Sequence, residues 1–257
     1  MKSLEDCVVT AMDGSDRGLF PYFPYILQDL WEIGADPDVI ISLITKHAKA
    51  FPNLHVLDLG CGKGAVSIRI AQKLNCRCYG IDAIPEFIDE AYKKAVEYRV
   101  DHLCKFEIND IRERIKTLPC FDIIILGSIG PVFGDYQATL TALSNCLAMN
   151  GLFIIDDGYI ENKSDFTHTL IQKQETVHRQ IRASGMQLVD EWVMDKNEIK
   201  DSDDYIFNHL NKRCSELIDR YPDKRRLFEN YIKKQEEENG VLENKVICSA
   251  MVIKRIA

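Results

Sequence analysis

The 257-residue sequence has little of what marks a secreted, membrane-spanning or nucleic-acid-binding protein. No apolar run approaches the roughly 20 residues that cross a bilayer, and the first residues contain no apolar stretch of signal-peptide length. Positive charge is scarce, because 32 Lys and Arg face 40 Asp and Glu, for a net charge of -8. A negative average disfavours nucleic acid as a partner. We therefore expect a soluble, cytoplasmic protein for which nucleic acid is an unlikely partner.

The cysteines show neither a disulfide nor a zinc pattern. Their number is odd, at nine, and a chain of this size does not need a disulfide framework. Cys76 and Cys78 are separated by one residue, and no second pair with ligand spacing follows. Both fall on one face of a predicted strand, where free thiols pack as small hydrophobes. We expect reduced cysteines and no metal site.

A short apolar strand runs directly into a glycine-rich turn in the sequence HVLDLGCGKGA, which begins at position 55. Such a turn before a helix lets the backbone approach a ligand and leaves the first N–H groups of the helix free to donate. Gly60-x-Gly62-x-x-Ala65 fits a dinucleotide-binding fingerprint. The spacing of Asp58, Gly60, Gly62 and Gly64 fits a second kind of cofactor motif. A glycine turn without a ligand is the third alternative.

Apolar strand patterns alternate with helical patterns from this turn to about residue 160. Alternation of this kind predicts a parallel sheet with right-handed crossovers, and ligands collect at the carboxyl ends of its strands. The predicted strands are 55–59, 77–81, 103–108, 121–126 and 152–155.

Acidic residues follow several of these strands. Asp82 lies about twenty residues after Gly60. At this spacing a doubly wound sheet brings a carboxylate beside the glycine turn, where the carboxylate can accept from the hydroxyls of a ribose. Asp110 follows the third strand and either accepts from the amino group of adenine or caps the turn 111–117. The fifth strand is followed by three candidates for a general base, whose alternative role is turn capping and packing: Asp156, Asp157 and Tyr159.

The remaining residues are expected to complete a single domain. Residues 1–52 form a helical extension, and 53–195 form the cofactor-binding core. A helix that carries Phe166, Leu170, Val177 and Ile181 on one face is predicted within that core. Residues 196–244 are a charged helical insertion, and 245–257 are a final strand that pairs antiparallel, so the sheet is mixed.

Two parts of this helical periphery have alternative functions. The extension contains an aromatic, proline-punctuated segment that either covers the sheet or closes as a lid over cofactor and substrate. The charged insertion serves either as a substrate lid or as the surface of a homodimer. The segment spans residues 20–25, and its candidate lid residues are Tyr22, Phe23 and Tyr25.

Taken together, these motifs resemble the class I S-adenosylmethionine-dependent methyltransferases. The resemblance covers roughly residues 40–195 and the final strand. Within the family the chain looks most similar to the small-molecule branch that includes the ubiquinone and menaquinone methyltransferases. The residues that carry it, in order and spacing, are Asp58 before the glycines, Asp82, Asn109-Asp110, Phe121-Asp122 and Asn150-Gly151.

The resemblance implies an α/β, Rossmann-like doubly wound mixed sheet of seven strands with the last one antiparallel. It implies S-adenosylmethionine as cofactor and transfer of its methyl to a small molecule by in-line displacement. The fourth strand ends in Gly-Ser-Ile-Gly-Pro and lacks the Asn/Asp-Pro-Pro-aromatic signature of enzymes that methylate base amino groups. The alternatives are an NAD-dependent oxidoreductase and a cofactor-binding subunit without transfer activity.

The resemblance also implies roles for individual residues. One group would contact the methionyl part of the cofactor, a second the ribose and adenine, and a third the region of the transferable methyl. In that order these are Asp58, Gly60, Cys61 and Gly62; Asp82, Ala83, Asp110 and Ile111; and Gly127 and Ser128.

Overall fold

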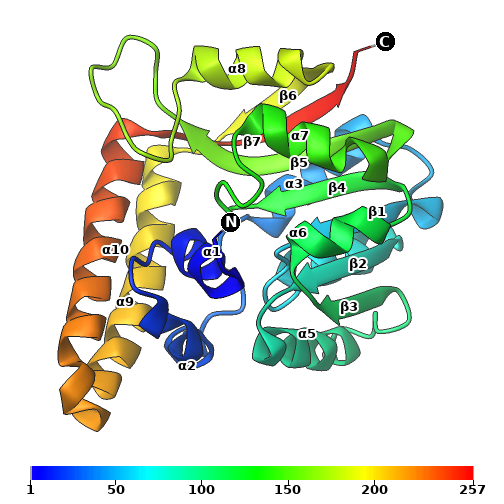
Figure 1. Cartoon of the computed structure of the whole chain (residues 1–257). Helices are drawn as coiled ribbons and strands as arrows, with labels where there is room; N and C mark the ends of the chain where they lie inside the picture. Colours follow the sequence, from blue (N-terminus) through cyan, green and yellow to red (C-terminus); the bar gives the residue numbers. More distant parts are fainter. Residues whose placement is uncertain (1, 257) are drawn as a thin grey trace.

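A seven-stranded sheet with helices on both faces forms the centre of the protein (Figure 1). The computed structural model describes residues 2–256, and its strands run in the order β3-β2-β1-β4-β5-β7-β6. The strands are β1 (His55–Leu59), β2 (Arg77–Asp82), β3 (Cys104–Ile108), β4 (Phe121–Gly127), β5 (Leu147–Tyr159), β6 (Met186–Val193) and β7 (Ile247–Arg255).

Helices connect the strands and extend beyond the sheet at one end. None of those between residues 2 and 256 combines the length and the apolar character that a bilayer crossing needs. The α-helices are α1 (Leu4–Ala11), α2 (Phe23–Ile26), α3 (Pro37–His47), α4 (Ala65–Leu74), α5 (Pro85–Glu97), α6 (Ile111–Arg114), α7 (Tyr136–Leu143), α8 (Gln174–Ala183), α9 (Lys196–Arg220) and α10 (Arg225–Lys245).

The predicted fold class is confirmed. Strands β1 to β5 pair in parallel, whereas β7 pairs antiparallel with both β5 and β6. The last strand is therefore inserted antiparallel into the sheet, and the long excursion between β6 and β7 consists of the helices α9 and α10.

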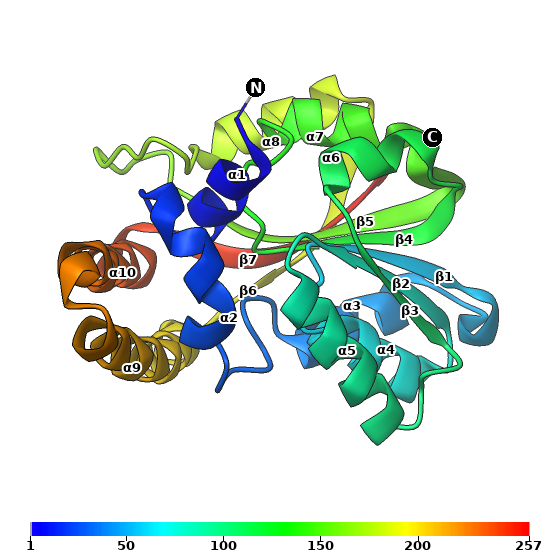
Figure 2. The same ribbon diagram turned by 60° about the horizontal axis from the view of Figure 1, so that its bottom comes forward.

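Two apolar layers enclose the sheet because consecutive strand residues point to opposite faces. Ile123 and Ile125 of β4 belong to the layer shared with α3, α4 and α5. Ile124 and Leu126 belong to the layer shared with α6, α7 and α8. Figure 2 shows these two sets of helices on opposite sides of the sheet.

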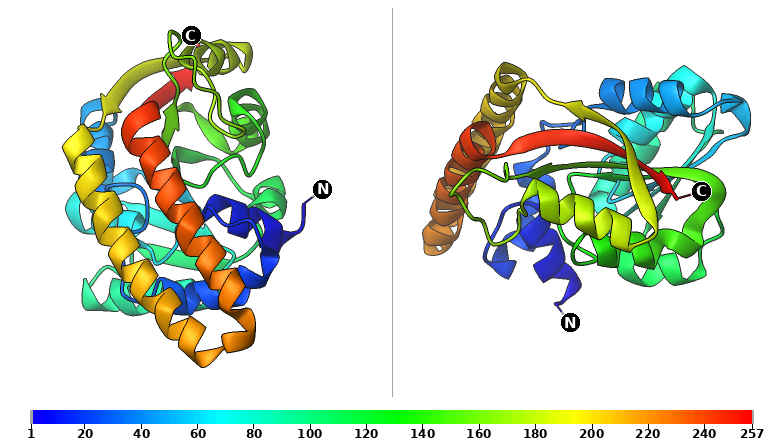
Figure 3. Two further views of the ribbon diagram at one scale, coloured as in Figure 1. Left: turned by 90° about the vertical axis from the view of Figure 1, so that its left-hand side faces the viewer. Right: turned by 90° about the horizontal axis from the view of Figure 1, so that it is seen from above.

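The N-terminal extension and the α9–α10 insertion form one helical cap (Figure 3). A third apolar cluster joins Phe23 and Leu27 of the extension to Leu217 of α9 and Phe228 of α10. An ion pair with 2.6 Å between Arg213 Nε and an Asp29 carboxylate oxygen crosses the same contact. The two segments are about 200 residues apart in sequence, so the cap depends on long-range packing.

Two predicted boundaries are wrong. The helix expected to include Phe166 and Leu170 begins only at Gln174, and the preceding residues form a loop in which Lys173 Nζ donates to the backbone carbonyl oxygens of Ser164 and Phe166. The fifth strand, predicted over 152–155, runs from Leu147 to Tyr159, because Leu147 pairs with β4 and residues 152–159 pair with β7.

Candidate functional site

The glycine turn after β1 forms one wall of a cleft at the carboxyl ends of the strands. Gly60, Gly62 and Gly64 all have positive φ angles, of 71°, 52° and 76°. A Cβ at Gly60 would lie 2.5 Å from Ile129 Cγ2, so this glycine is required by close packing. A Cβ at Gly62 would meet nothing within 4 Å. The backbone at Gly62 is therefore open to a ligand, as the motif predicts.

The cleft lies between this turn and the end of the N-terminal extension. Of the residues predicted to contact the methionyl part and the methyl, the cleft is lined by Asp58, Gly60, Cys61, Gly62 and Gly127. The opposite wall consists of Trp31, Ile33 and Ala35.

Asp82 at the end of β2 is buried, at 8% exposure, and its carboxylate is fixed by the backbone. Gly62 N donates to Oδ2 at 2.9 Å, and Ile84 N donates to Oδ1 at 2.9 Å. Each oxygen has two lone pairs, so both retain capacity for one more donor. The same carboxylate thus shapes the glycine turn and can still accept from a ligand. Ala83, predicted to flank adenine, is half-buried beside it.

Asp58 and Cys61 lie beneath the glycine turn. Burial raises the pKa of Asp58 to about 6, although its carboxylate accepts from Ser67 Oγ at 2.7 Å. Burial and the nearby carboxylates of Asp58 and Asp82 raise the pKa of the Cys61 thiol well above its ordinary value. This thiol is therefore neutral, and the ionisable groups beneath the turn that can carry negative charge are Asp58 and Asp82.

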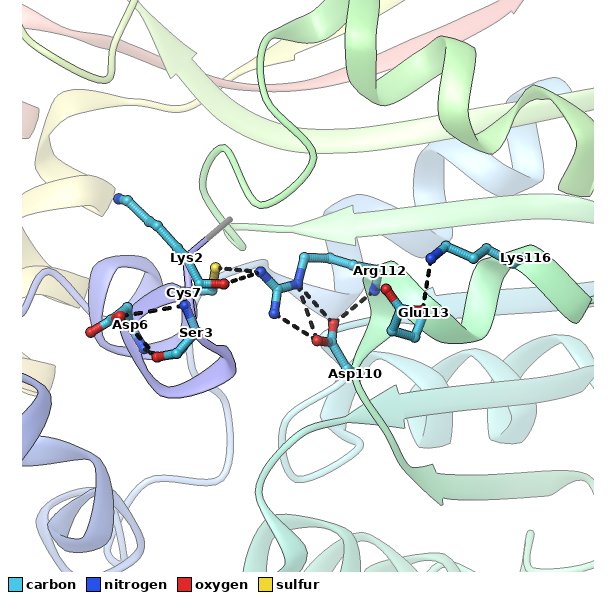
Figure 4. A network of polar contacts seen from close by, with 8 residues as sticks. All are labelled: Lys2, Ser3, Asp6, Cys7, Asp110, Arg112, Glu113 and Lys116. Atoms are coloured by element: carbon cyan, nitrogen blue, oxygen red, sulfur yellow. Dashed lines mark hydrogen bonds and ion pairs between the residues drawn. The ribbon is translucent and has the colours of Figure 1, made fainter.

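Asp110 is the N-cap of α6 and forms a close ion pair (Figure 4). Its carboxylate accepts from Arg112 N at 2.9 Å and from Arg112 Nη2 at 2.6 Å, and this hydrogen bonding lowers the pKa of Asp110. Arg112 also donates to Lys2 O and Cys7 Sγ, each at 3.0 Å, and so ties α1 to this loop. Of the two predicted roles of Asp110, capping is therefore observed. Ile111 is buried in the core layer on the α6 side.

Ser128 and Asp156 meet where β4 ends beside β5. Ser128 has a positive φ of 54°, and its N–H donates to Asp156 O at 2.9 Å. Its hydroxyl donates to Asp156 Oδ1 at 3.4 Å. Asp156 is 8% exposed, and burial, with a smaller contribution from the charge of Asp157, raises its pKa to about 7. Asp156 thus changes protonation near neutral pH, beside the residues predicted to lie near the transferable methyl.

Asp157 and Tyr159 point to the other face of the sheet. Tyr136 Oη donates to Asp157 Oδ2 at 2.9 Å, and Gly158 N donates to Oδ1 at 2.8 Å. Tyr159 is 2% exposed within the core layer, and burial raises its pKa to about 12. Both side chains have internal partners, so their observed role is packing and hydrogen bonding, the alternative considered from the sequence. Because these residues continue β5, only Asp156 of the three faces the side of the glycine turn.

The aromatic residues predicted as a lid contact the helical insertion. Phe23 packs edge-on against Tyr231, and Tyr22 packs against Phe228. Tyr25 Oη donates to a carboxylate oxygen of Glu216 at 2.6 Å. These contacts join the N-terminal extension to the insertion within the cap. The residues of the extension that line the cleft are instead Trp31, Ile33 and Ala35.

Two residues that the sequence analysis did not assign to the site are Lys63 and Trp31. Lys63 is the one long polar side chain inside the glycine motif, and Trp31 Nε1 donates to Lys63 O at 3.1 Å. The position of Lys63 within the motif is the signal that could have drawn attention to it. Among residues 2–256, no group of three or more His, Cys, Asp and Glu side chains is arranged to hold a metal ion.

Comparison with known proteins agrees with this arrangement. Residues 50–211 match the family model described as a methyltransferase domain, and the chain belongs to that family. A methyltransferase from Geobacter sulfurreducens, solved with S-adenosyl-L-homocysteine, superposes with a TM-score of 0.75 at 14% identity, covering 92% of this chain and 98% of its own. A similar complex from Thiobacillus denitrificans gives 0.73 at 15% identity, with coverages of 91% and 98%.

A third structure extends the likeness to the cap. The cyclopropane synthase MmaA2 from Mycobacterium tuberculosis superposes with a TM-score of 0.74 at 14% identity and covers 98% of this chain and 99% of its own. At these identities the structures establish the fold. The family match, which spans most of the core, identifies the protein as a methyltransferase and does not favour the oxidoreductase alternative.

Proposed function

We propose that the protein transfers a methyl group from S-adenosylmethionine to a small-molecule acceptor by in-line displacement. The observation that carries this proposal is the open backbone at Gly62, which faces the cleft and is joined to the carboxylate of Asp82 by a 2.9 Å hydrogen bond. One short loop thus presents both a contact surface for the aminoacyl part of the cofactor and an acceptor for its ribose. The complexes with S-adenosyl-L-homocysteine of similarly folded proteins support the same ligand.

The charge of the cleft favours S-adenosylmethionine over a nicotinamide dinucleotide. Asp58 and Asp82 lie at or beside the cleft, and no arginine lines it. A pyrophosphate carries two negative charges and would be repelled by these carboxylates, whereas a sulfonium is positive. Lys63, the one cation among the lining residues, already pairs with Glu90 at 3.0 Å.

The residues of this chain would divide the work of binding. Asp82 would accept from the ribose hydroxyls, and Gly60, Cys61 and Gly62 would contact the methionyl part above Asp58. Ala83, Asp110 and Ile111 would surround the adenine, although both carboxylate oxygens of Asp110 already accept from Arg112. When bound, S-adenosylmethionine supplies an electrophilic methyl carbon on a sulfonium. Gly127 and Ser128 would lie beside that carbon.

Asp156 is our candidate for the general base. Its carboxylate lies next to Ser128, and its pKa of about 7 suits proton transfer at neutral pH. Asp156 would take the proton that the acceptor loses when it receives the methyl group of bound S-adenosylmethionine. Alignment of the two reactants in the cleft can contribute about 7–11 kcal/mol to lowering the barrier.

The cap would enclose the acceptor. The N-terminal extension and the 196–244 insertion pack on each other within one chain, so a single subunit supplies both walls. Tyr22, Phe23 and Tyr25 would hold the extension on the insertion. The homodimer predicted from the charged insertion is tested by light scattering of the purified protein.

The experiment that tests the function is a labelled-methyl screen. Purified protein is incubated with S-adenosylmethionine labelled in the methyl group and a panel of small metabolites with hydroxyl, amine, thiol and activated carbon nucleophiles. We expect label in one product class, and loss of that product with Asp156→Asn. Tight S-adenosylhomocysteine binding without turnover on any class would instead indicate a cofactor-binding subunit.

A further inference from the structure

Lys63 is a fully buried lysine at the centre of the glycine turn. It is 1% exposed, and its ammonium group donates to Leu27 O at 2.8 Å and pairs with a carboxylate oxygen of Glu90 at 3.0 Å. The ring of Phe87 lies 5.7 Å from Nζ. Leu27 belongs to the N-terminal extension and Glu90 to α5, so one side chain joins the cap to the core.

The connection is reciprocal. Trp31 Nε1 donates to the backbone carbonyl oxygen of Lys63 at 3.1 Å, while Lys63 Nζ donates to the carbonyl oxygen of Leu27. Two bonds in opposite directions therefore join the same loop residue to positions four apart in the extension. Trp31, Ile33 and Ala35 then form the wall of the cleft that faces the glycine turn.

Apolar packing also holds this junction. In the cluster that builds the cap, the core contributes Ile84 and Phe87, two and five residues after Asp82. The ring of Trp31 lies 4.9 Å from that of Tyr98, and Ala35 is buried in the layer shared with α3, α4 and α5. Burying an ammonium group costs more than burying an apolar side chain of similar length, even when the charge is paired. A lysine at this position therefore contributes something that packing alone does not, namely a directional bond from the cofactor loop to the wall opposite.

We propose that Lys63 is a positioning residue that couples closure of the 27–35 segment to binding at the glycine turn. This inference rests on the proposed cofactor site. The 27–35 segment is one wall of the cleft. For this segment to move away from the glycine turn, the hydrogen bonds that join Lys63 to Leu27 and to Trp31 must both break. A ligand that contacts both walls stabilises the closed position of the segment. Because such coupling is reciprocal, closure of the segment strengthens ligand binding by the same free energy.

Lys63→Met tests the proposal, because methionine keeps the length of the side chain and removes the ammonium group. Lys73→Met is the matched control, since Lys73 is an exposed lysine at the end of α4. The measurements are calorimetry with S-adenosylhomocysteine and hydrogen exchange of segments 23–35 and 60–64 with and without that ligand. In the wild type and in Lys73→Met we expect the ligand to slow exchange in both segments.

In Lys63→Met we expect at least tenfold weaker binding, and at saturating ligand we expect protection of 60–64 but not of 23–35. A purely structural lysine would lower stability and leave the two segments protected together. If Lys63→Met does not fold, Trp31→Phe removes the reciprocal N–H donor, together with part of the ring that packs on Tyr98, and keeps an aromatic side chain. It should weaken binding about threefold with the same loss of protection at 23–35. Unchanged affinity and joint protection in the folded variant would overturn the inference. Failure of the wild type to bind would instead refute the proposed function.

Discussion

Two buried aspartates at the same edge of the sheet have opposite surroundings. Asp82, on the side expected to bind the cofactor, has each carboxylate oxygen fixed by a backbone N–H at 2.9 Å. Asp156, on the side expected to bind the acceptor, receives one side-chain bond, from Ser128 Oγ at 3.4 Å. Both are 8% exposed. Equal burial with unequal hydrogen bonding means that Asp82 is held in place, whereas Asp156 is free to exchange a proton.

The difference separates binding from chemistry. Backbone donors favour the charged carboxylate, so they oppose the desolvation that raises the pKa of Asp82. Asp156 has no backbone donor, and its pKa reaches about 7. The cofactor side is therefore built in advance by the chain itself, while the acceptor side keeps a group whose charge can change during a reaction. The predictions below test this contrast.

The largest effect is expected on the acceptor side. Asp156→Asn keeps the oxygen that accepts from Ser128 but cannot take a proton, and it should lower kcat by about 10²–10⁴-fold. In the wild type kcat/KM should rise with pH through about 7, because the base must be ionised, and this limb should disappear in the variant. A labelled-methyl assay from pH 5 to 9 measures both. An unchanged pH profile would exclude Asp156 as the base.

On the cofactor side, Asp82→Ala should weaken S-adenosylhomocysteine binding by about 10- to 150-fold. This range corresponds to about 1.5–3 kcal/mol, the contribution of hydrogen bonds to a charged group. Asp122→Ala is the control, since Asp122 also accepts from a backbone N–H, that of His55 at 2.9 Å, but at the opposite end of β1. Calorimetry should show full affinity for the control. Equal losses in both variants would point to general destabilisation.

Gly62→Ala tests whether the open backbone is the contact surface. A methyl group at this position meets no protein atom within 4 Å, so any effect on affinity should come from the space that it takes from the ligand. We expect affinity to fall about 10- to 100-fold, in line with about 1–3 kcal/mol for overpacking. Gly185→Ala is a matched control, because Gly185 also has a positive φ, of 76°, and open surroundings, in the exposed turn before β6. Both variants should lose similar stability in urea, and only Gly62→Ala should lose affinity.

Stability as a function of pH provides a further test of Asp156. Its folded-state pKa of about 7 lies above the ordinary value of 3.8, so the folded protein binds this proton more tightly than the unfolded chain does. The contribution to stability is therefore greatest below pH 4 and is lost as pH rises to about 7, by on the order of 1 kcal/mol per pH unit.

Asp156→Asn should remove this dependence. Urea denaturation at pH 5 and pH 8 should show the variant gaining stability relative to the wild type at the higher pH. Asp58, whose pKa is also raised by burial, affects both proteins equally. A constant difference between the two pH values would contradict the assignment of the high pKa to Asp156.

The smallest effect is expected at the adenine end. Arg112→Ala removes the bonds from α1 to the Asp110 loop, and partly exposed ion pairs contribute about 0–1 kcal/mol. Affinity for S-adenosylhomocysteine should fall less than about fivefold, while hydrogen exchange in α1 becomes faster. Lys116→Ala, which breaks the exposed pair with Glu113, should change neither. A large loss of affinity in Arg112→Ala would mean that α1 forms part of the cofactor site.

The cofactor side could be predicted from the sequence because its signals are local. A strand, three closely spaced glycines and a helix follow one another within twenty residues, and Asp82 ends the next strand. The acceptor side depends on distant contacts. Asp156 and its neighbours look like turn residues, and they are held as strand by pairing with β7, where Asp156 lies opposite Ala250. Asp156 also pairs with Gly127 of β4 on its other side.

The hydrogen bonds between Lys63 and the N-terminal extension could not be predicted from the sequence for the same reason. The Lys63 partners Leu27 and Trp31 lie 36 and 32 residues away, in the helical extension, and no sequence motif links them to the glycine turn. Similarly, Phe166 and Leu170 share a helical spacing with α8 but lie in a loop, because Lys173 satisfies loop carbonyl oxygens that a helix would have paired. The spacing of apolar residues identifies the buried face of a helix. It does not show which polar side chain elsewhere in the chain will form hydrogen bonds with the backbone in place of the helix.

The most direct test of the central claim is a pair of calorimetric titrations of the wild-type protein. The glycine turn with Asp82 should bind S-adenosylhomocysteine at one site per chain and should show no heat of binding with NAD. Binding of NAD at that site, or the absence of S-adenosylhomocysteine binding by the folded protein, would contradict the account.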